Sequence, residues 1–138
     1  LDTKNPDHPY NLGVMYAKQG ATQKAISLFK RAFYIAPAHT RSRVALAVIY
    51  SEEADRLIPL LHSREYFWGM GKRKFNKTKA TVNDLLAKAE QVLTEGLDLN
   101  PDDTQLLETL LMIYKQMGKK EKREQIEKRL EVLGGQSE

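Results

Sequence analysis

Apolar side chains recur at helical spacing along most of the chain, and glycine and proline interrupt them. Within residues 6–39, Leu12, Met15 and Tyr16 follow an i, i+3, i+4 spacing, which predicts a helix with one apolar face. A second apolar set at the same spacing predicts a second helix. Its members are Ala25, Leu28, Phe29, Ala32 and Phe33.

Helix-breaking residues mark the limits of these two predicted helices. Gly20 suits a left-handed residue at the end of the first helix, and Thr22 suits the cap of the second. Pro37 cannot continue a helix, so the second helix is expected to stop near Ile35. The segment is therefore predicted to be a helical hairpin.

This hairpin resembles one tetratricopeptide repeat, a helix–turn–helix unit of about 34 residues. The matching positions are Leu12, Gly13, Tyr16, Gly20, Ala25, Phe29, Ala32 and Pro37. Pro9 stands where the family has Trp, a tolerable change because proline suits the first turn of a helix. The resemblance implies an all-α, right-handed solenoid of helix-turn-helix repeats that binds a protein partner.

A second, interrupted repeat is expected at residues 40–103. Its first helix carries Val44, Leu46, Ala47 and Tyr50, and its second carries Ala89, Leu93 and Gly96 before Pro101. The distance between Pro37 and Pro101 exceeds one repeat by about 30 residues, which indicates an insertion at about 54–80. Thr81 and Asp84 resemble a capping box and predict the start of the second helix.

A third, degenerate repeat is expected at residues 104–133, followed by a disordered tail at 134–138. Its first helix carries Leu107, Leu110, Leu111 and Tyr114 and is predicted to end at Gly118. Its last helix offers only a thin stripe of Ile126, Leu130 and Leu133, as a terminal helix would, and Gly134 and Gly135 should end it. Residues 1–138 thus form a single domain of about three repeats. Because the chain begins at Leu1, and residues 1–7 look like the tail of an earlier repeat, we expect a fragment of a longer protein.

The insertion at 54–80 leaves three interpretations open. A helix over 56–67, broken by Gly69 and Gly71, could pack on the repeats and leave a solvated basic loop. Alternatively Tyr66, Phe67 and Trp68 could anchor a partner-binding arm. The third reading is a contact with nucleic acid or an anionic membrane through the cations Lys72, Arg73, Lys74, Lys77 and Lys79. A different alignment would make 53–67 a shortened second helix and 81–99 an extra one.

The resemblance also implies a concave groove lined by the first helix of each repeat. The expected partner-binding residues are Tyr10, Val14, Lys18, Arg41, Val44, Val48, Met112 and Lys115, with Phe67 and Trp68 of the insertion. Asp7, Ala17, Ser51, Glu52, Gln105, Glu108 and Gln116 are expected beside them. The apolar floor favours an apolar segment or an amphipathic helix of another protein.

Composition narrows the function further. The 138 residues carry 22 basic and 18 acidic side chains, an excess too small to favour nucleic acid unless the charge is clustered. The chain has no cysteine and no apolar run long enough to span a membrane. The three histidines are scattered, so no metal, cofactor or enzymatic activity is expected. The compartment is not fixed, although cytoplasm is favoured over periplasm, and self-association through an exposed apolar face at residues 10–15 is a further expectation.

Overall fold

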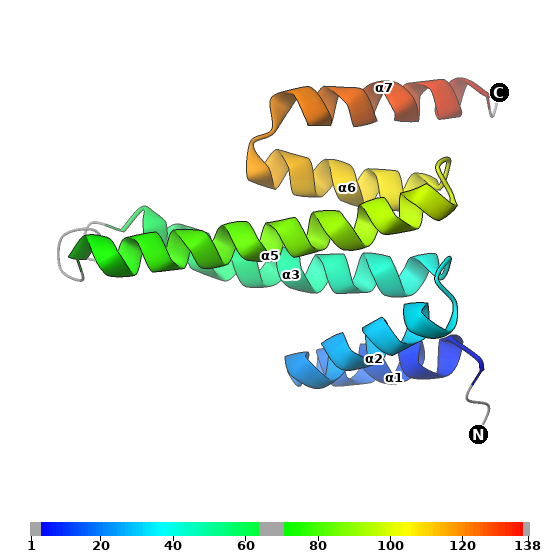
Figure 1. The fold of residues 1–138 in the computed structure, drawn as a ribbon, viewed down its shortest axis with the longest axis horizontal. Coiled ribbons are helices and arrows are strands. Elements are labelled where there is room, and N and C mark those ends of the chain that lie inside the picture. Colours follow the sequence, from blue (N-terminus) through cyan, green and yellow to red (C-terminus); the bar gives the residue numbers. More distant parts are fainter. Residues whose placement is uncertain (1–3, 64–70, 137–138) are drawn as a thin grey trace.

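The computed structural model describes residues 4–63 and 71–136, and this part of the chain is built from six α-helices with no strand (Figure 1). The predicted all-α class is therefore confirmed. The helices are α1 (Asp7–Lys18), α2 (Thr22–Ile35), α3 (Thr40–Leu61), α5 (Gly71–Leu99), α6 (Thr104–Met117) and α7 (Lys120–Gln136).

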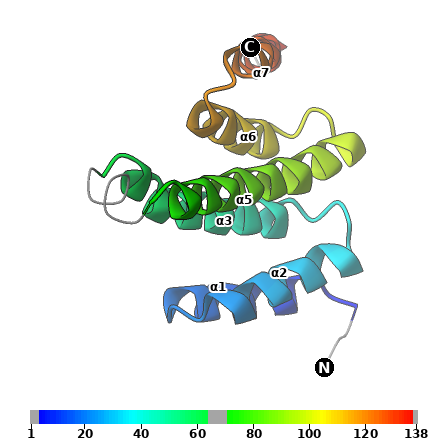
Figure 2. The same ribbon diagram turned by 60° about the vertical axis from the view of Figure 1, so that its left-hand side comes forward.

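The helices pack as three consecutive antiparallel pairs, α1 with α2, α3 with α5, and α6 with α7. The pairs stack in chain order, so that α3 lies between α2 and α6, and α5 also contacts α6. Figure 2 shows the N-terminal pair at one end of the stack and α7 at the other. This arrangement is the helix-turn-helix solenoid that the sequence predicts.

Small and large side chains interlock at the centre of the stack. Ala25 and Phe29 of α2, Leu46 and Ala47 of α3, and Leu93 of α5 are almost completely buried. Further core side chains come from the same faces of α5 and α6: Val82, Leu85, Leu86, Ala89, Leu106, Leu107, Leu110, Ile113 and Tyr114. The small residues allow neighbouring helices to approach closely. In the first two pairs, the core therefore contains the positions that resemble those of a tetratricopeptide repeat.

The turns follow the predicted chemistry with one exception. Gly20 and Gly118 adopt left-handed conformations, with φ of +79° and +72°, and follow the ends of α1 and α6. Pro37 follows α2, which ends at Ile35 as expected. The predicted capping role of Thr22 is wrong, because Thr22 already lies inside α2 and the preceding Ala21 has no side chain that can cap it.

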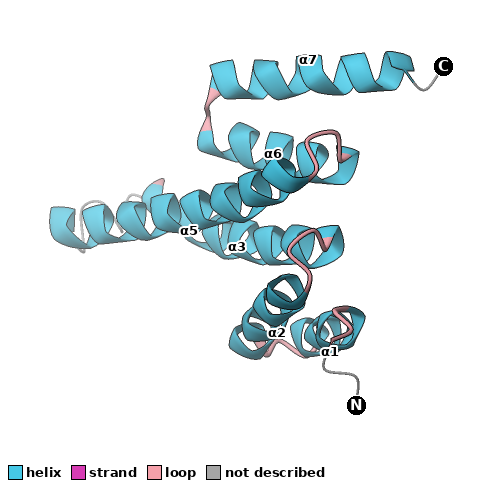
Figure 3. Ribbon diagram, turned by 45° about the vertical axis from the view of Figure 1, so that its right-hand side comes forward, coloured by secondary structure: helices cyan, strands magenta, loops and turns pink. Residues whose placement is uncertain are grey.

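The insertion differs most from the expectation. The structure extends both helices of the second pair: α3 runs for 22 residues to Leu61, and α5 runs for 29 residues from Gly71. Together they form a hairpin that projects beyond the other helices (Figures 1 and 3). Residues 71–80 are thus helical, and the interpretation of this basic run as a solvated loop is wrong. Neither a separate helix from residue 56 nor a helix start at Thr81 is found.

Tertiary packing explains why the predicted separate helix from residue 56 and the predicted helix start at Thr81 are not found. Leu57, Ile58 and Leu61 pack against the buried cluster, which favours continuing α3 through Pro59 in its last turns. Thr81 lies within α5, and its hydroxyl donates to the carbonyl of Lys77 one turn earlier. The alternative alignment makes 53–67 a separate, shortened helix. It is wrong because α3 continues without a break to Leu61.

Both ends of the stack expose apolar surface. On α1, Leu12 is 42% and Met15 56% exposed, so the predicted face is corrected: Pro9 and Gly13 are the buried residues of this helix. On α7, Ile126, Leu130 and Leu133 are only half-buried, which agrees with a terminal helix. The helix continues through Gly134 and Gly135, contrary to the expected stop.

Candidate partner-binding site

A hollow of about 330 Å³ lies where the first helices of the first two pairs meet. Six of the ten predicted partner-binding residues line it: Tyr10, Val14, Lys18, Arg41, Val44 and Val48. Ala17 and Glu52 complete its walls, and Gln105 reaches it from α6. The geometry thus brings together residues more than 30 positions apart, and we call this hollow the α1–α3 groove.

One end of the α1–α3 groove carries a preorganised polar cluster. Asp7 Oδ1 lies 3.2 Å from Nη2 of Arg41 and 3.0 Å from Nε2 of His39. The hydrogen bond with His39, joined by the charge of Arg41, lowers the pKa of the Asp7 carboxyl. The Arg41 guanidinium also lies over the ring of Tyr10, 5.1 Å from its centroid.

His39 fixes this cluster to the backbone. It is the N-cap of α3, and its Nδ1 accepts a hydrogen bond from the amide of Ser42 at 3.3 Å. Its ring packs edge-on against Tyr10, whose own ring lies 5.9 Å from that of Phe29. The side chain therefore caps α3 and packs against Tyr10 at the mouth of the groove.

The other end of the groove is more open. Lys18 at the end of α1 and Glu52 on α3 are both exposed and form no ion pair within the described residues. Between the two polar ends lie Val14, Val44 and Val48, all half-buried. The groove can therefore accept apolar side chains along its middle and charged groups of either sign at its ends.

The third pair contributes less to this site than predicted. Met112 and Lys115 are exposed on α6 but do not line the α1–α3 groove. Gln116 instead joins α6 to α3: its amide group accepts from the Ser51 hydroxyl at 2.7 Å and donates to Asp55 at 2.6 Å. Ser51 and Gln116 are therefore hydrogen-bonded to each other.

The remaining predicted partner-binding residues, Phe67 and Trp68, lie outside the described residues, as does Tyr66. The basic run beside them is helical, and Lys72, Arg73, Lys77 and Lys79 are exposed along the first part of α5.

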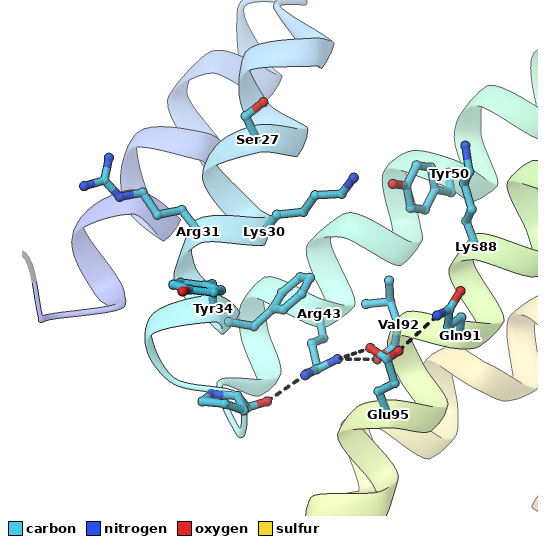
Figure 4. A pocket seen from close by; sticks show the side chains of 12 residues that line it. Ser27, Lys30, Arg31, Tyr34, Arg43, Tyr50, Lys88, Gln91, Val92 and Glu95 are labelled. Carbon is cyan, nitrogen blue, oxygen red and sulfur yellow. Dashed lines mark hydrogen bonds and ion pairs between the residues drawn. The ribbon is translucent and has the colours of Figure 1, made fainter.

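A larger hollow that the sequence did not predict lies on another side of α3. It has a volume of about 940 Å³ and is formed by the second helices α2 and α5 over the side of α3 (Figure 4). Its lining includes Lys30, Arg31, Phe33, Tyr34, Arg43, Tyr50, Lys88, Val92 and Glu95. We call it the α2–α5 pocket.

Arg43 forms the floor of the α2–α5 pocket and is 5% exposed. Its Nε donates to the carbonyl of Pro37 at 2.8 Å, and its Nη1 donates to the carbonyl of Val92 at 2.9 Å. The guanidinium lies 4.5 Å from the ring centroid of Phe33 and 3.4 Å from a carboxylate oxygen of Glu95. This one side chain joins the loop after α2 to α5.

The described residues contain no cluster of His, Cys, Asp or Glu that could hold a metal ion. Within the same ranges, no helix is both long and apolar enough to cross a membrane. The chemistry that the two hollows offer is therefore apolar contact, hydrogen bonding and charge.

Comparison with known proteins identifies the repeat. The family model described as tetratricopeptide repeat matches residues 10–39. The resemblance of the first helical hairpin to a tetratricopeptide repeat is therefore confirmed over these residues. The match covers α2 and most of α1, which together build one wall of the α1–α3 groove. Tetratricopeptide repeats serve as protein-interaction scaffolds, and the helical stack around this repeat has the corresponding solenoid form.

Solved structures of MamA resemble the chain at low identity. MamA of AMB-1 is 21% identical, with 95% of this chain and 74% of that chain covered and a TM-score of 0.35. MamA of MSR-1 is 21% identical, with 97% and 79% covered and a TM-score of 0.37. These superpositions are too loose to assign roles to individual residues. A search of curated protein sequences finds no match.

Proposed function

We propose that this protein is a protein–protein interaction scaffold that binds a peptide or an amphipathic helix of its partner in the α1–α3 groove. The observation that supports this most is the hollow itself, where Tyr10, Val14, Val44 and Val48 form an apolar strip between two polar ends. An apolar strip on adjacent helices suits anchors spaced at i, i+3 or i+4 on a bound helix. No catalysis is part of this proposal.

The polar ends would set the direction of the bound segment. Arg41 is already held by Asp7 and stacked on Tyr10, so it presents a fixed guanidinium at one end. Lys18 and Glu52 are exposed at the other end, where each can pair with a charge on the partner. The middle of the strip would supply affinity through burial of apolar area, and the ends would supply specificity.

Site-specific photo-crosslinking in native extract tests the proposal. A photoreactive residue at Val48 is expected to capture a polypeptide, whereas the same residue at Lys128, an exposed position on α7, should not. Val14→Glu combined with Val44→Glu should abolish capture by the photoreactive residue at Val48 without unfolding the chain, which circular dichroism would check. Equal capture at Val48 and Lys128, or capture unaffected by the two substitutions, would rule the groove out.

The projecting hairpin supports a second candidate, a basic adaptor that contacts nucleic acid or an anionic surface. The supporting observation is that Lys72, Arg73, Lys77 and Lys79 are exposed on one helix segment without an acidic residue among positions 71–80. Binding through these cations should weaken steeply with added salt, because phosphate contacts release counterions. Binding in the apolar groove should change little, so a salt titration separates the two candidates.

A further inference from the structure

The α2–α5 pocket is large enough to hold several side chains. At about 940 Å³ it lies within the range of known ligand sites. It exists because α2 and α5 both contact α3 but pack little on each other, which leaves a hollow between them. Phe33, Tyr50 and Val92 give it apolar walls from three different helices (Figure 4).

Positive charge dominates the mouth of this pocket. Figure 4 shows Lys30 extending from α2 toward Tyr50 and Lys88, so cations approach the hollow from both walls. Lys30 forms no ion pair within the described residues, and Lys88 pairs only with Asp84 on its own helix, at 3.1 Å. The carboxylate of Glu95 is already bound by Arg43 and by the amide of Gln91. Among the described lining residues, Lys30 is thus a cation without an ion-pair partner, Lys88 has only Asp84 of its own helix, and Glu95 is not free to pair with either.

An exposed aromatic ring completes the rim. Tyr34 is 85% exposed beside the half-buried Phe33, although large apolar rings usually avoid full exposure. Tyrosine and arginine are enriched among the residues that dominate protein–protein binding energy. The exposed ring is therefore free to contact a partner at the edge of the hollow.

We propose that the α2–α5 pocket is a second binding site, on a different side of α3 from the groove, for an acidic segment of a partner protein. The segment would insert an aromatic or branched aliphatic side chain between Phe33 and Val92 and place its carboxylates near Lys30 and Lys88. Charge complementarity argues for this occupant, since the apolar walls require a side chain and the rim requires anions. A phosphate polymer would leave the apolar walls unfilled and would lie beside Glu95.

Selection from a library of short random peptides displayed on phage, using the whole chain as bait, tests this proposal. Enriched peptides should combine Asp or Glu with an aromatic or branched aliphatic residue. Their affinity, measured by fluorescence anisotropy, should fall about tenfold in Lys30→Gln/Lys88→Gln and also in Tyr34→Ala. All three residues are at the surface of the fold, and circular dichroism would verify that the variants stay folded.

Matched variants make the result specific. Lys120→Gln/Lys128→Gln removes two exposed cations from α7 and should leave the affinity unchanged, as should Val48→Glu in the α1–α3 groove. The proposal is overturned if no peptide is enriched, if enriched peptides lack acidic residues, or if Lys30→Gln/Lys88→Gln binds them as well as the unaltered chain. It is also overturned if a short single-stranded oligonucleotide binds with the same dependence on Lys30 and Lys88.

Discussion

Phe29 on α2 packs with the edge of its ring against the backbone of Gly13 on α1. A Cβ placed on Gly13 would come within 2.8 Å of Cε1 and 3.0 Å of Cδ1 of that ring. Phe29 is 2% exposed, so its ring has little room to move. The missing side chain at position 13 therefore sets the distance between the two helices of the first repeat.

The first prediction is that Gly13→Ala destabilises the protein. Overpacking costs about 1–3 kcal/mol, and better helix propensity returns up to about 1 kcal/mol, so a net loss of about 1 kcal/mol is expected. In a Phe29→Leu background the clash is absent, so the same substitution should stabilise. Urea denaturation of the four proteins measures both differences. A loss of equal size in both backgrounds would mean that Gly13 is needed for another reason.

The sequence predicted the first repeat well because its signals are local. Gly20 and Pro37 limit the helices through backbone conformation alone, and neither depends on what packs nearby. The apolar spacing of Leu12 and Met15 does not show which side of α1 is buried, and both side chains are exposed. Only the neighbouring helix decides that the side of Gly13 faces Phe29.

The hairpin and the larger pocket needed information that no local pattern contains. The Thr81–Asp84 pair indicates a helix start, but packing of α3 along α5 outweighs it and α5 begins at Gly71, whereas Gly69 lies outside the described residues. The α1–α3 groove was largely predicted, because repeat spacing aligns α1 with α3. The α2–α5 pocket was missed, because its lining comes from three helices and depends on how far α2 and α5 stand apart.

A second prediction concerns the way Arg43 stabilises the stack. Its strongest contacts are the hydrogen bonds to the carbonyls of Pro37 and Val92, whereas Glu95 is half-exposed and 3.4 Å away. Arg43→Lys cannot make both carbonyl bonds and should cost about 2 kcal/mol. Glu95→Gln should cost less than about 0.5 kcal/mol, as for an exposed ion pair. Chemical denaturation measures the loss of stability in each of the two variants. Similar losses would mean that Arg43 stabilises the stack through its ion pair with Glu95 and not through the carbonyl bonds.

A third prediction is a pH dependence at Glu90, which joins α5 to both following helices. Partial burial acts to raise the pKa of this carboxyl, but hydrogen bonds from Tyr114 and Lys122 and the nearby Lys119 lower it overall. A lowered pKa means that the ionised form stabilises the fold. The contribution is fully present above the unfolded-state pKa of about 4.3 and is lost as the pH falls through the folded-state value.

Glu90→Gln should therefore destabilise the protein by about 1 kcal/mol near neutral pH, and the difference should shrink below about pH 4. Denaturation curves over this pH range measure the effect. Glu131→Gln on the exposed side of α7 is the matched control and should show no such trend. A difference that stays constant down to about pH 3 would contradict the role given to the Glu90 charge.

The last prediction concerns the start of α5, where Lys72 and Arg73 occupy the first turn. Positive charges at a helix N-terminus oppose the helix dipole, at a cost of about 0.3–1 kcal/mol each at low salt. Lys72→Glu/Arg73→Glu should thus slow amide hydrogen exchange in residues 74–80, and salt near 1 M should remove most of the gain. Lys77→Glu/Lys79→Glu, placed beyond the first turn, is the control and should give a smaller change. If both double variants slow exchange equally, relief of repulsion among the cations, rather than the dipole, would explain the effect. If neither does, the basic residues carry no local electrostatic cost.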